Sequence, residues 1–340
     1  MDALRVLILF DTDYPPPGDQ NFTSLARIHK SEVEFQVAAA LRRCGHRVRL
    51  LGFRNDLGAL LAGLVAEPSD VVFNLCERFG GNCSLDAAVT GMLEMLGLAY
   101  TGSPPAALWL ARDKAKTKHV LAGCGVPVPR FFEVPTAQPM AHCSLRYPVI
   151  VKPLEEDASV GISLKAIVNS FEAVAERVAL VHRRYGAAIV EEFIEGRELY
   201  VGVMGDPPQA LPAREMLFHG DTPARARIAT FRAKWDWDYR KQHGIRNRRA
   251  LKMPANVQQH LSDIAVRSFV ALGLRDYARV DVRLSADGIP YVIEVNPNPY
   301  LAWGEDMSES AASVGLGYSQ FLESLVHMAL KMRSSRQSQL

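Results

Sequence analysis

The sequence predicts a protein of mixed α/β and α+β class, built from several domains and opening with a doubly wound parallel sheet. The chain of 340 residues is longer than a single hydrophobic core usually spans, so we expect two or three domains. Hydrophobic residues make up 48% and charged residues 22%, which excludes a disordered or fibrous chain. In the first hundred residues, continuous apolar runs alternate with amphipathic segments, which is typical of parallel strands covered by helices on both faces.

The first unit is expected to alternate strands and helices. Ser31, followed three residues later by Glu34, has the capping-box pattern that predicts a helix start, and Gly97 predicts a helix end. The expected strands are residues 4–10, 46–53, 70–75 and 98–102, and the expected helices are residues 31–43, 56–66 and 84–96.

Prolines at 104–105, 127 and 129 separate the alternating strands and helices of the first unit from a strand-rich segment. A charged helix at 113–118 is expected between these prolines. Beyond Pro129 we expect strands at 130–134, 148–152, 162–167 and 187–193, with one helix that ends at Tyr185. Later strands are expected at 197–204, 277–284 and 289–295, and helices at 254–272 and 308–331. The predicted domains are residues 1–103, 104–187 and 188–331, followed by a frayed tail at 332–340.

Charge and cysteine content narrow the class of protein. Lys and Arg number 39 against 37 Asp and Glu, so the net charge of +2 favours neither nucleic acid nor a membrane surface as a partner. No stretch of about 18 apolar residues and no signal-peptide cleavage pattern is present, so a cytoplasmic protein is expected. Five scattered cysteines without C-x-x-C spacing indicate reduced thiols at mostly buried positions: Cys44, Cys76, Cys83, Cys124 and Cys143.

The common catalytic signatures are absent from the sequence. The strongest candidate site lies on a predicted hairpin near the C-terminus. Strand alternation puts Arg279, Asp281 and Arg283 on one face of its first strand. It puts Glu294 and Asn296 on one face of the second strand. If the strands pair, Asp281, Glu294 and Asn296 form an oxygen cluster that suits Mg²⁺ held together with nucleotide phosphates. An exposed hairpin face with a ladder of charges is the alternative.

A second candidate feature is a lysine followed by a loop of small residues. Lys152 ends an apolar strand, and the loop at 158–162 offers backbone amides to phosphate oxygens. A surface lysine beside a hairpin turn would have the same pattern. Glu191 and Glu198, on or beside another apolar strand, suit hydrogen bonds from adenine and ribose, although a half-exposed strand with a charged face fits as well.

A basic segment at 225–252 contains interleaved aromatic residues, Trp235, Trp237 and Tyr239. This mixture occurs in nucleic-acid-binding proteins. The net charge of +2 and the absence of a nucleic-acid motif favour a different interpretation. We expect a loop around nucleotide phosphates and an acidic substrate, with a solvated outer face.

Taken in order, these segments resemble the ATP-grasp superfamily and, within it, the D-alanine–D-alanine ligase-like carboxylate–amine ligases. The resemblance covers nearly the whole chain. It implies an ATP-grasp fold behind an N-terminal α/β domain, and a ligase that forms an acyl phosphate from ATP and a carboxylate before an amine attacks. The motifs that carry it lie at 72–75, 97–103, 113–118, 149–153, 159–161, 191–198, Lys234, 279–281, 294–297 and 317–319.

The resemblance implies ATP-binding roles for individual residues. Lys118, or its helix neighbour Lys114, would contact the phosphates together with Lys152. The adenine would lie against Glu191 and the backbone beyond it, while Glu198 would hold the ribose. The remaining nucleotide contacts would come from Ser159, Val160 and Gly161 in the mobile loop, from Glu192 and Phe193, and from Lys234 at the γ-phosphate.

The same resemblance implies the catalytic groups. Asp281, Glu294 and Asn296 would bind two Mg²⁺ ions, for which Mn²⁺ is an alternative, and Arg279 would stabilise the oxyanion of the tetrahedral intermediate. The substrates would be small molecules that resemble amino acids. A homodimer is an option from the family, although no segment of the sequence indicates an interface.

The substrate side departs from the family. D-alanine ligases have a Pro-Gly-Met run after the asparagine and a nearby serine that binds the second substrate's carboxylate. Here the run continues through Tyr300, and Glu305 falls at the serine position, where an acid would repel a carboxylate. We therefore predict a ligase other than a true D-alanine–D-alanine ligase. True D-alanine–D-alanine ligase activity with a drifted loop, and a catalytically inactive nucleotide-binding regulator, are the alternatives.

Overall fold

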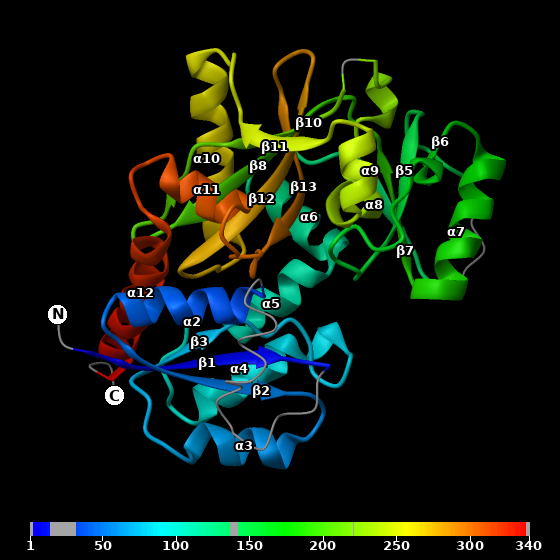
Figure 1. The fold of residues 1–340 in the computed structure, drawn as a ribbon. Helices are drawn as coiled ribbons and strands as arrows, with labels where there is room; N and C mark the ends of the chain where they lie inside the picture. The colour runs from blue at the N-terminus through cyan, green and yellow to red at the C-terminus, as the bar shows by residue number, and fades with distance from the viewer. Residues whose placement is uncertain (1–2, 14–31, 137–141, 220, 338–340) are drawn as a thin grey trace.

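The computed structural model describes residues 3–13, 32–136, 142–219 and 221–337, which fold around three sheets. In Figure 1 the N-terminal three-stranded sheet lies below a six-stranded sheet, and a four-stranded sheet lies to one side. The predicted mixed α/β and α+β class is confirmed.

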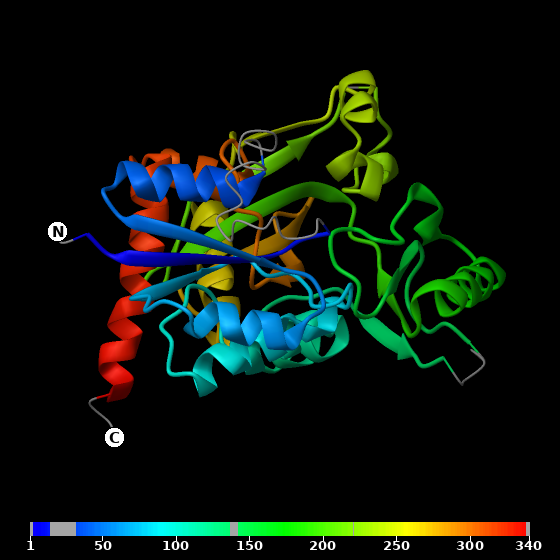
Figure 2. The same ribbon diagram turned by 60° about the horizontal axis from the view of Figure 1, so that its bottom comes forward.

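The N-terminal sheet is parallel, in the order β2-β1-β3. Alternate side chains of β1 enter two separate cores, Val6 and Ile8 in one and Leu7 and Leu9 in the other. Helices α2 and α12 cover the first core, and α3 and α4 cover the second (Figure 2), so the doubly wound arrangement is confirmed. The bounds are β1 (Arg5–Asp11), α2 (Val33–Arg43), β2 (Arg47–Phe53), α3 (Leu57–Val65), β3 (Val71–Asn74), α4 (Asp86–Met95) and α12 (Tyr318–Gln337).

Two details of this unit differ from the prediction. Residues 98–102 form only an isolated bridge between Tyr100 and Val72, because the N–H of Asn74, which would continue the pairing, donates to Thr101 Oγ1 at 3.0 Å. Helix α2 has Glu32 as its N-cap, without a side-chain cap hydrogen bond, whereas Ser31 lies outside the described residues.

The four-stranded sheet is antiparallel, in the order β4-β7-β5-β6, and α7 (Phe171–Tyr185) packs against it. Its strands are β4 (Phe131–Val134), β5 (Val149–Pro153), β6 (Ile167–Val168) and β7 (Ala188–Glu192). The predicted boundary between 187 and 188 is wrong, because β7 is hydrogen-bonded on both sides within this sheet. The expected strand at 162–167 is also wrong: Leu164–Ala166 form a 3-10 turn, and the carbonyl of Ile162 accepts from the N–H of Phe231 instead.

The six-stranded sheet is antiparallel and follows the path β11-β10-β8-β12-β13, with β9 paired to β8. Helices α5, α6 and α10 contribute to its core, although α5 and α6 were assigned to the central domain by sequence. The bounds are α5 (Pro105–Arg112), α6 (Lys114–Gly123), β8 (Gly196–Met204), β9 (Gln209–Ala210), β10 (Arg214–Leu217), β11 (Arg246–Arg249), α10 (Ala255–Ala271), β12 (Tyr277–Ser285) and β13 (Pro290–Asn296).

The C-terminal segment contains two helices in place of the single one predicted. Helix α11 (Asp306–Ala312) ends before Gly315, whose φ of +89° is unfavourable for other residues, and α12 continues to Gln337 through most of the expected frayed tail. The expectation for the thiols is partly wrong, since all five are free but only Cys76 is buried. No helix among the described residues is long and apolar enough to span a membrane.

Candidate active site

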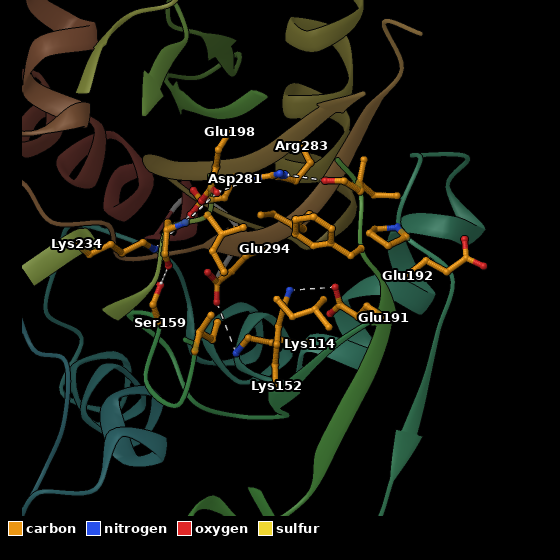
Figure 3. Close-up of a pocket in the computed structure, with 18 residues that line it drawn as sticks. Lys114, Lys152, Ser159, Glu191, Glu192, Glu198, Lys234, Asp281, Arg283 and Glu294 are labelled. Carbon is orange, nitrogen blue, oxygen red and sulfur yellow. Dashed lines mark hydrogen bonds and ion pairs between the residues drawn. The ribbon is translucent and has the colours of Figure 1, made fainter. Parts of the chain in front are cut away.

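A cavity lies between the four-stranded and six-stranded sheets, and its volume, with the space that is open to solvent, is about 620 Å³. Figure 3 shows the charged side chains that converge on it from both sheets and from the loops between them. Most of the predicted site residues line it: Lys114, Lys152, Ser159, Glu191, Glu192, Phe193, Glu198, Lys234, Asp281 and Glu294. Lys118, Val160, Gly161, Arg279, Asn296, Tyr300 and Glu305 are not part of its wall.

Lysines at one end of the cavity are held by a buried carboxylate. Lys152 Nζ on β5 donates to Glu191 Oε2 on β7 at 3.0 Å, and Lys118 Nζ lies 3.3 Å from Glu191 Oε1. Burial opposes ionisation of Glu191, but the two lysines hold its pKa below the ordinary value. The predicted adenine contact of Glu191 therefore involves a carboxylate that already pairs with two cations.

The structure separates the two lysines between which the sequence did not decide. Lys118 is 1% exposed and donates to the carbonyl of Ile293 at 2.6 Å, so it lies behind the cavity wall. Burial lowers the pKa of Lys118 to about 8, against the opposing effect of Glu191. Lys114 lines the cavity, where its Nζ lies 3.5 Å from Glu294 Oε1 and donates to the carbonyl of Glu156.

The predicted metal ligands lie on two paired strands. Asp281 on β12 is opposite Glu294 on β13, and Arg279 is opposite Asn296. Arg279 donates two hydrogen bonds to Asp281, at 2.7 and 2.9 Å, and Lys234 Nζ lies 3.9 Å from the same carboxylate. Burial alone would raise the pKa of Glu294, but Lys114 and the other nearby cations lower it to about 2. Both carboxylates therefore face cations.

This donor set fits Mg²⁺. The buried side-chain nitrogen of Asn296 has no hydrogen-bond partner among the described residues. Asp281 and Glu294 offer two carboxylates and Asn296 an amide oxygen, and the described residues contain no group of three or more His, Cys, Asp or Glu that could hold a metal unaided. An incomplete oxygen shell suits an ion that takes its remaining ligands from phosphates and water.

A loop between Leu154 and Ser163 closes one side of the cavity. Ala158 and Ser159 have φ values of +55° and +63°, and Gly161 has +72°. Ser159 Oγ donates to the carbonyl of Ala229 at 2.7 Å, and Trp235 Nε1 donates to the carbonyl of Ala158 at 3.0 Å. The segment that carries Lys234, in α8 (Phe231–Trp235) before α9 (Trp237–Gln242), is thus fastened to the predicted phosphate loop.

The opposite end of the cavity contains Glu198 on β8. Its carboxylate accepts from the Tyr200 hydroxyl at 3.1 Å, from the N–H of Ala229 at 3.0 Å and from Arg283 at 3.0 Å. Glu192 borders the cavity, but its side chain points away (Figure 3) and accepts from the N–H of Arg146 at 3.0 Å. The cofactor contact predicted for Glu192 is therefore not available to its carboxylate in this conformation.

Two groups of residues remain outside the expectation. Arg283 lines the cavity; strand alternation placed it on the same face as Asp281, but no role was predicted for it. The apolar residues Ile150, Ile194 and Ile293 also line the cavity, and no sequence signal distinguishes them. Glu305 caps α11 away from the cavity, and burial raises its pKa with a further contribution from Asp306.

Comparison with known proteins identifies the family. The family model for the D-ala D-ala ligase C-terminus matches residues 120–327. The D-alanine–D-alanine ligase of Gluconobacter oxydans is 34% identical over 293 residues, covering 86% of this chain and 91% of that protein. The uncharacterized protein y4sG of Sinorhizobium fredii is 33% identical over 301 residues, covering 86% of each chain.

The fold agrees with this assignment. The structure of D-alanine–D-alanine ligase from Bacillus anthracis complexed with ATP has a TM-score of 0.76 and 21% identity, and covers 98% of this chain and 100% of that one. The chain therefore belongs to the D-alanine–D-alanine ligase family within the ATP-grasp superfamily, and it is an ATP-dependent carboxylate–amine ligase.

Proposed function

We propose that this enzyme joins a carboxylic acid to an amine that lacks a carboxylate at the position where D-alanine ligases bind one. The proposal is supported by Glu305, which by residue count falls at the position where the family resemblance implies a serine. An ionised glutamate repels a substrate carboxylate. The carboxylic acid is proposed to be a small molecule that resembles an amino acid.

The cavity supplies the groups that the reaction needs. A carboxylate oxygen of the substrate attacks the γ-phosphorus of ATP, and the bond between this phosphorus and the oxygen that bridges it to the β-phosphate breaks. ADP is the leaving group, and the product is an acyl phosphate. Lys114, Lys152 and Lys234 line the cavity and are proposed to bind the phosphates. Asp281, Glu294 and Asn296 would hold Mg²⁺, which we propose to be two ions, and bound Mg²⁺ would neutralise charge on the phosphates.

The second step needs a cation near the carbonyl. The amine attacks the acyl carbon, loses a proton, and releases inorganic phosphate as the carbon–oxygen bond breaks. Arg279 is proposed to stabilise the oxyanion, an effect of roughly 3–4 kcal/mol for one donor in comparable sites. Because Arg279 also binds Asp281 at 2.7 and 2.9 Å, its position and that of the metal ligand are coupled.

A second candidate is D-alanine–D-alanine ligation itself, the activity for which several relatives are named. An acid-by-amine matrix with Mg²⁺ and ATP, scored by phosphate release and product mass, separates the two. We expect D-alanine alone to give background release, amines without a carboxylate to stimulate it, and Glu305→Ser to shift the preference towards D-alanine. Robust D-alanyl-D-alanine formation by the unmodified chain would overturn the proposal. Nucleotide binding without phosphate release for any acid and amine pair would favour the alternative of a catalytically inactive nucleotide-binding regulator.

A further inference from the structure

Arg283 on β12 is a buried arginine in the wall of the cavity, at the end occupied by Glu198. It is 3% exposed, and its guanidinium lies 5.1 Å from the ring centre of Phe193. Its Nε donates to the carbonyl of Ile194 at 2.9 Å, and its Nη1 donates to the carbonyl of Arg227 at 2.7 Å and to Glu198 at 3.0 Å. Arg283 thus contacts the link between β7 and β8, the segment before α8, and Glu198.

Glu198 has little acceptor capacity left. An ionised carboxylate offers about four lone-pair sites. The Tyr200 hydroxyl, the N–H of Ala229 and Arg283 already donate to it. We therefore expect Glu198 to accept from one ligand hydroxyl, and not from two.

Arg283 has one donor left. Its Nη2 is buried and has no hydrogen-bond partner among the described residues, although the side chain lines the cavity. A buried donor without a partner is unfavourable. A ligand oxygen entering this end of the cavity, with a small shift of the lining, would supply the missing acceptor.

We propose that Arg283 and Glu198 together recognise the two ribose hydroxyls of the nucleotide, an inference that rests on use of a nucleotide by this cavity. Glu198 accepts a hydrogen bond from one hydroxyl, and Arg283 Nη2 donates to the oxygen of the other. Arg283 is then a specificity-determining residue for ribonucleotides. If Arg283 only holds the backbone at Ile194 and Arg227 in place, its loss should weaken the binding of every nucleotide by the same factor.

The test measures binding and does not require the amine substrate. Calorimetry with Mg²⁺ would compare ADP, 2′-deoxy-ADP and 3′-deoxy-ADP on the full chain and on Arg283→Met. For the unmodified chain we expect each deoxy compound to bind about tenfold more weakly than ADP, the effect of one hydrogen bond to a charged group. For Arg283→Met we expect ADP to weaken about tenfold and one deoxy compound to bind as well as ADP.

Controls separate this role from a structural one. Arg197→Met removes a two-bond contact with Glu215 on the same sheet, outside the cavity, and should keep the discrimination of the unmodified chain. If Arg283→Met does not fold, Arg283→Lys retains the charge and should lose discrimination at the same hydroxyl. Equal weakening of all three nucleotides in the Arg283 variant would overturn the proposal. Failure of the unmodified chain to bind ADP would instead refute nucleotide use by this cavity.

Discussion

Replacing Arg112 by methionine should destabilise the fold and weaken nucleotide binding. Arg112 ends α5, where one guanidinium nitrogen lies 2.8 Å from Asp86 at the start of α4 and another lies 3.2 Å from Asp157 in the phosphate loop. The side chains of Arg112 and Asp86 are 11% and 9% exposed, whereas that of Asp157 is 44% exposed. One residue thus links the N-terminal unit to the loop beside the cavity.

The two contacts differ in energy because they differ in burial. Removing one partner of a buried ion pair leaves an uncompensated charge and costs about 3–5 kcal/mol. A half-exposed pair contributes about 0–1 kcal/mol. We therefore expect Arg112→Met to lower the free energy of unfolding by about 3 kcal/mol through Asp86. We expect the Asp157 contact to hold the loop at 154–163, so nucleotide binding should weaken by up to about fivefold.

Urea unfolding and ADP calorimetry would measure both effects. The double variant Asp86→Asn with Arg112→Met should recover at least half of the lost stability, because no buried carboxylate then remains unpaired. Arg5→Met is the matched control, since its pair with Asp70 is also short, at 2.6 Å, but the two side chains are 50% and 31% exposed. An Arg112→Met variant as mildly affected as Arg5→Met would refute the reasoning.

Two further substitutions test the loop and the domain junction. Gly161→Ala would place a methyl group 2.9 Å from Pro153 at a φ of +72°, so the loop at 154–163 should shift. We expect ADP binding, measured by calorimetry, to weaken about tenfold, and unchanged binding would contradict this. Burial raises the pKa of Asp276 to about 6, so protonation of this carboxyl stabilises the fold below about pH 4, and that stability is lost as the pH rises through 6. Asp276→Asn keeps an acceptor for the N–H of Gly102 and should exceed the unmodified chain in stability by about 3 kcal/mol at pH 7, and by little at pH 4, in urea unfolding. A gain that does not grow with pH would contradict that cause.

The predictable part of the site was its strand register. Alternation along β12 and β13 was enough to bring Asp281 and Glu294 together, because side-chain direction in a strand is set locally. The choice between Lys114 and Lys118 was not predictable, since residues four apart share one helix face. The contacts of Lys118 with the carbonyl of Ile293 and with Glu191, both on distant strands, hold it behind the cavity wall.

Parts of the fold could not be predicted because they depend on pairing between distant strands. Strand β11 has the sequence RNRR, without apolar alternation, and its extended form depends on pairing with β10. The assignment of β7 to the four-stranded sheet likewise depends on partners β4 and β5, which no local pattern reveals. Long-range pairing therefore decided the domain limit that the sequence placed at 187.

The central claim is that ATP activates a carboxylate as an acyl phosphate in the cavity that contains Asp281 and Glu294. It is tested most directly with ¹⁸O in the carboxylate of the acid that the substrate matrix identifies, by mass analysis of the released phosphate. We expect one ¹⁸O atom per inorganic phosphate, and loss of product formation in Asp281→Asn. Unlabelled phosphate, or label recovered in AMP, would contradict the account.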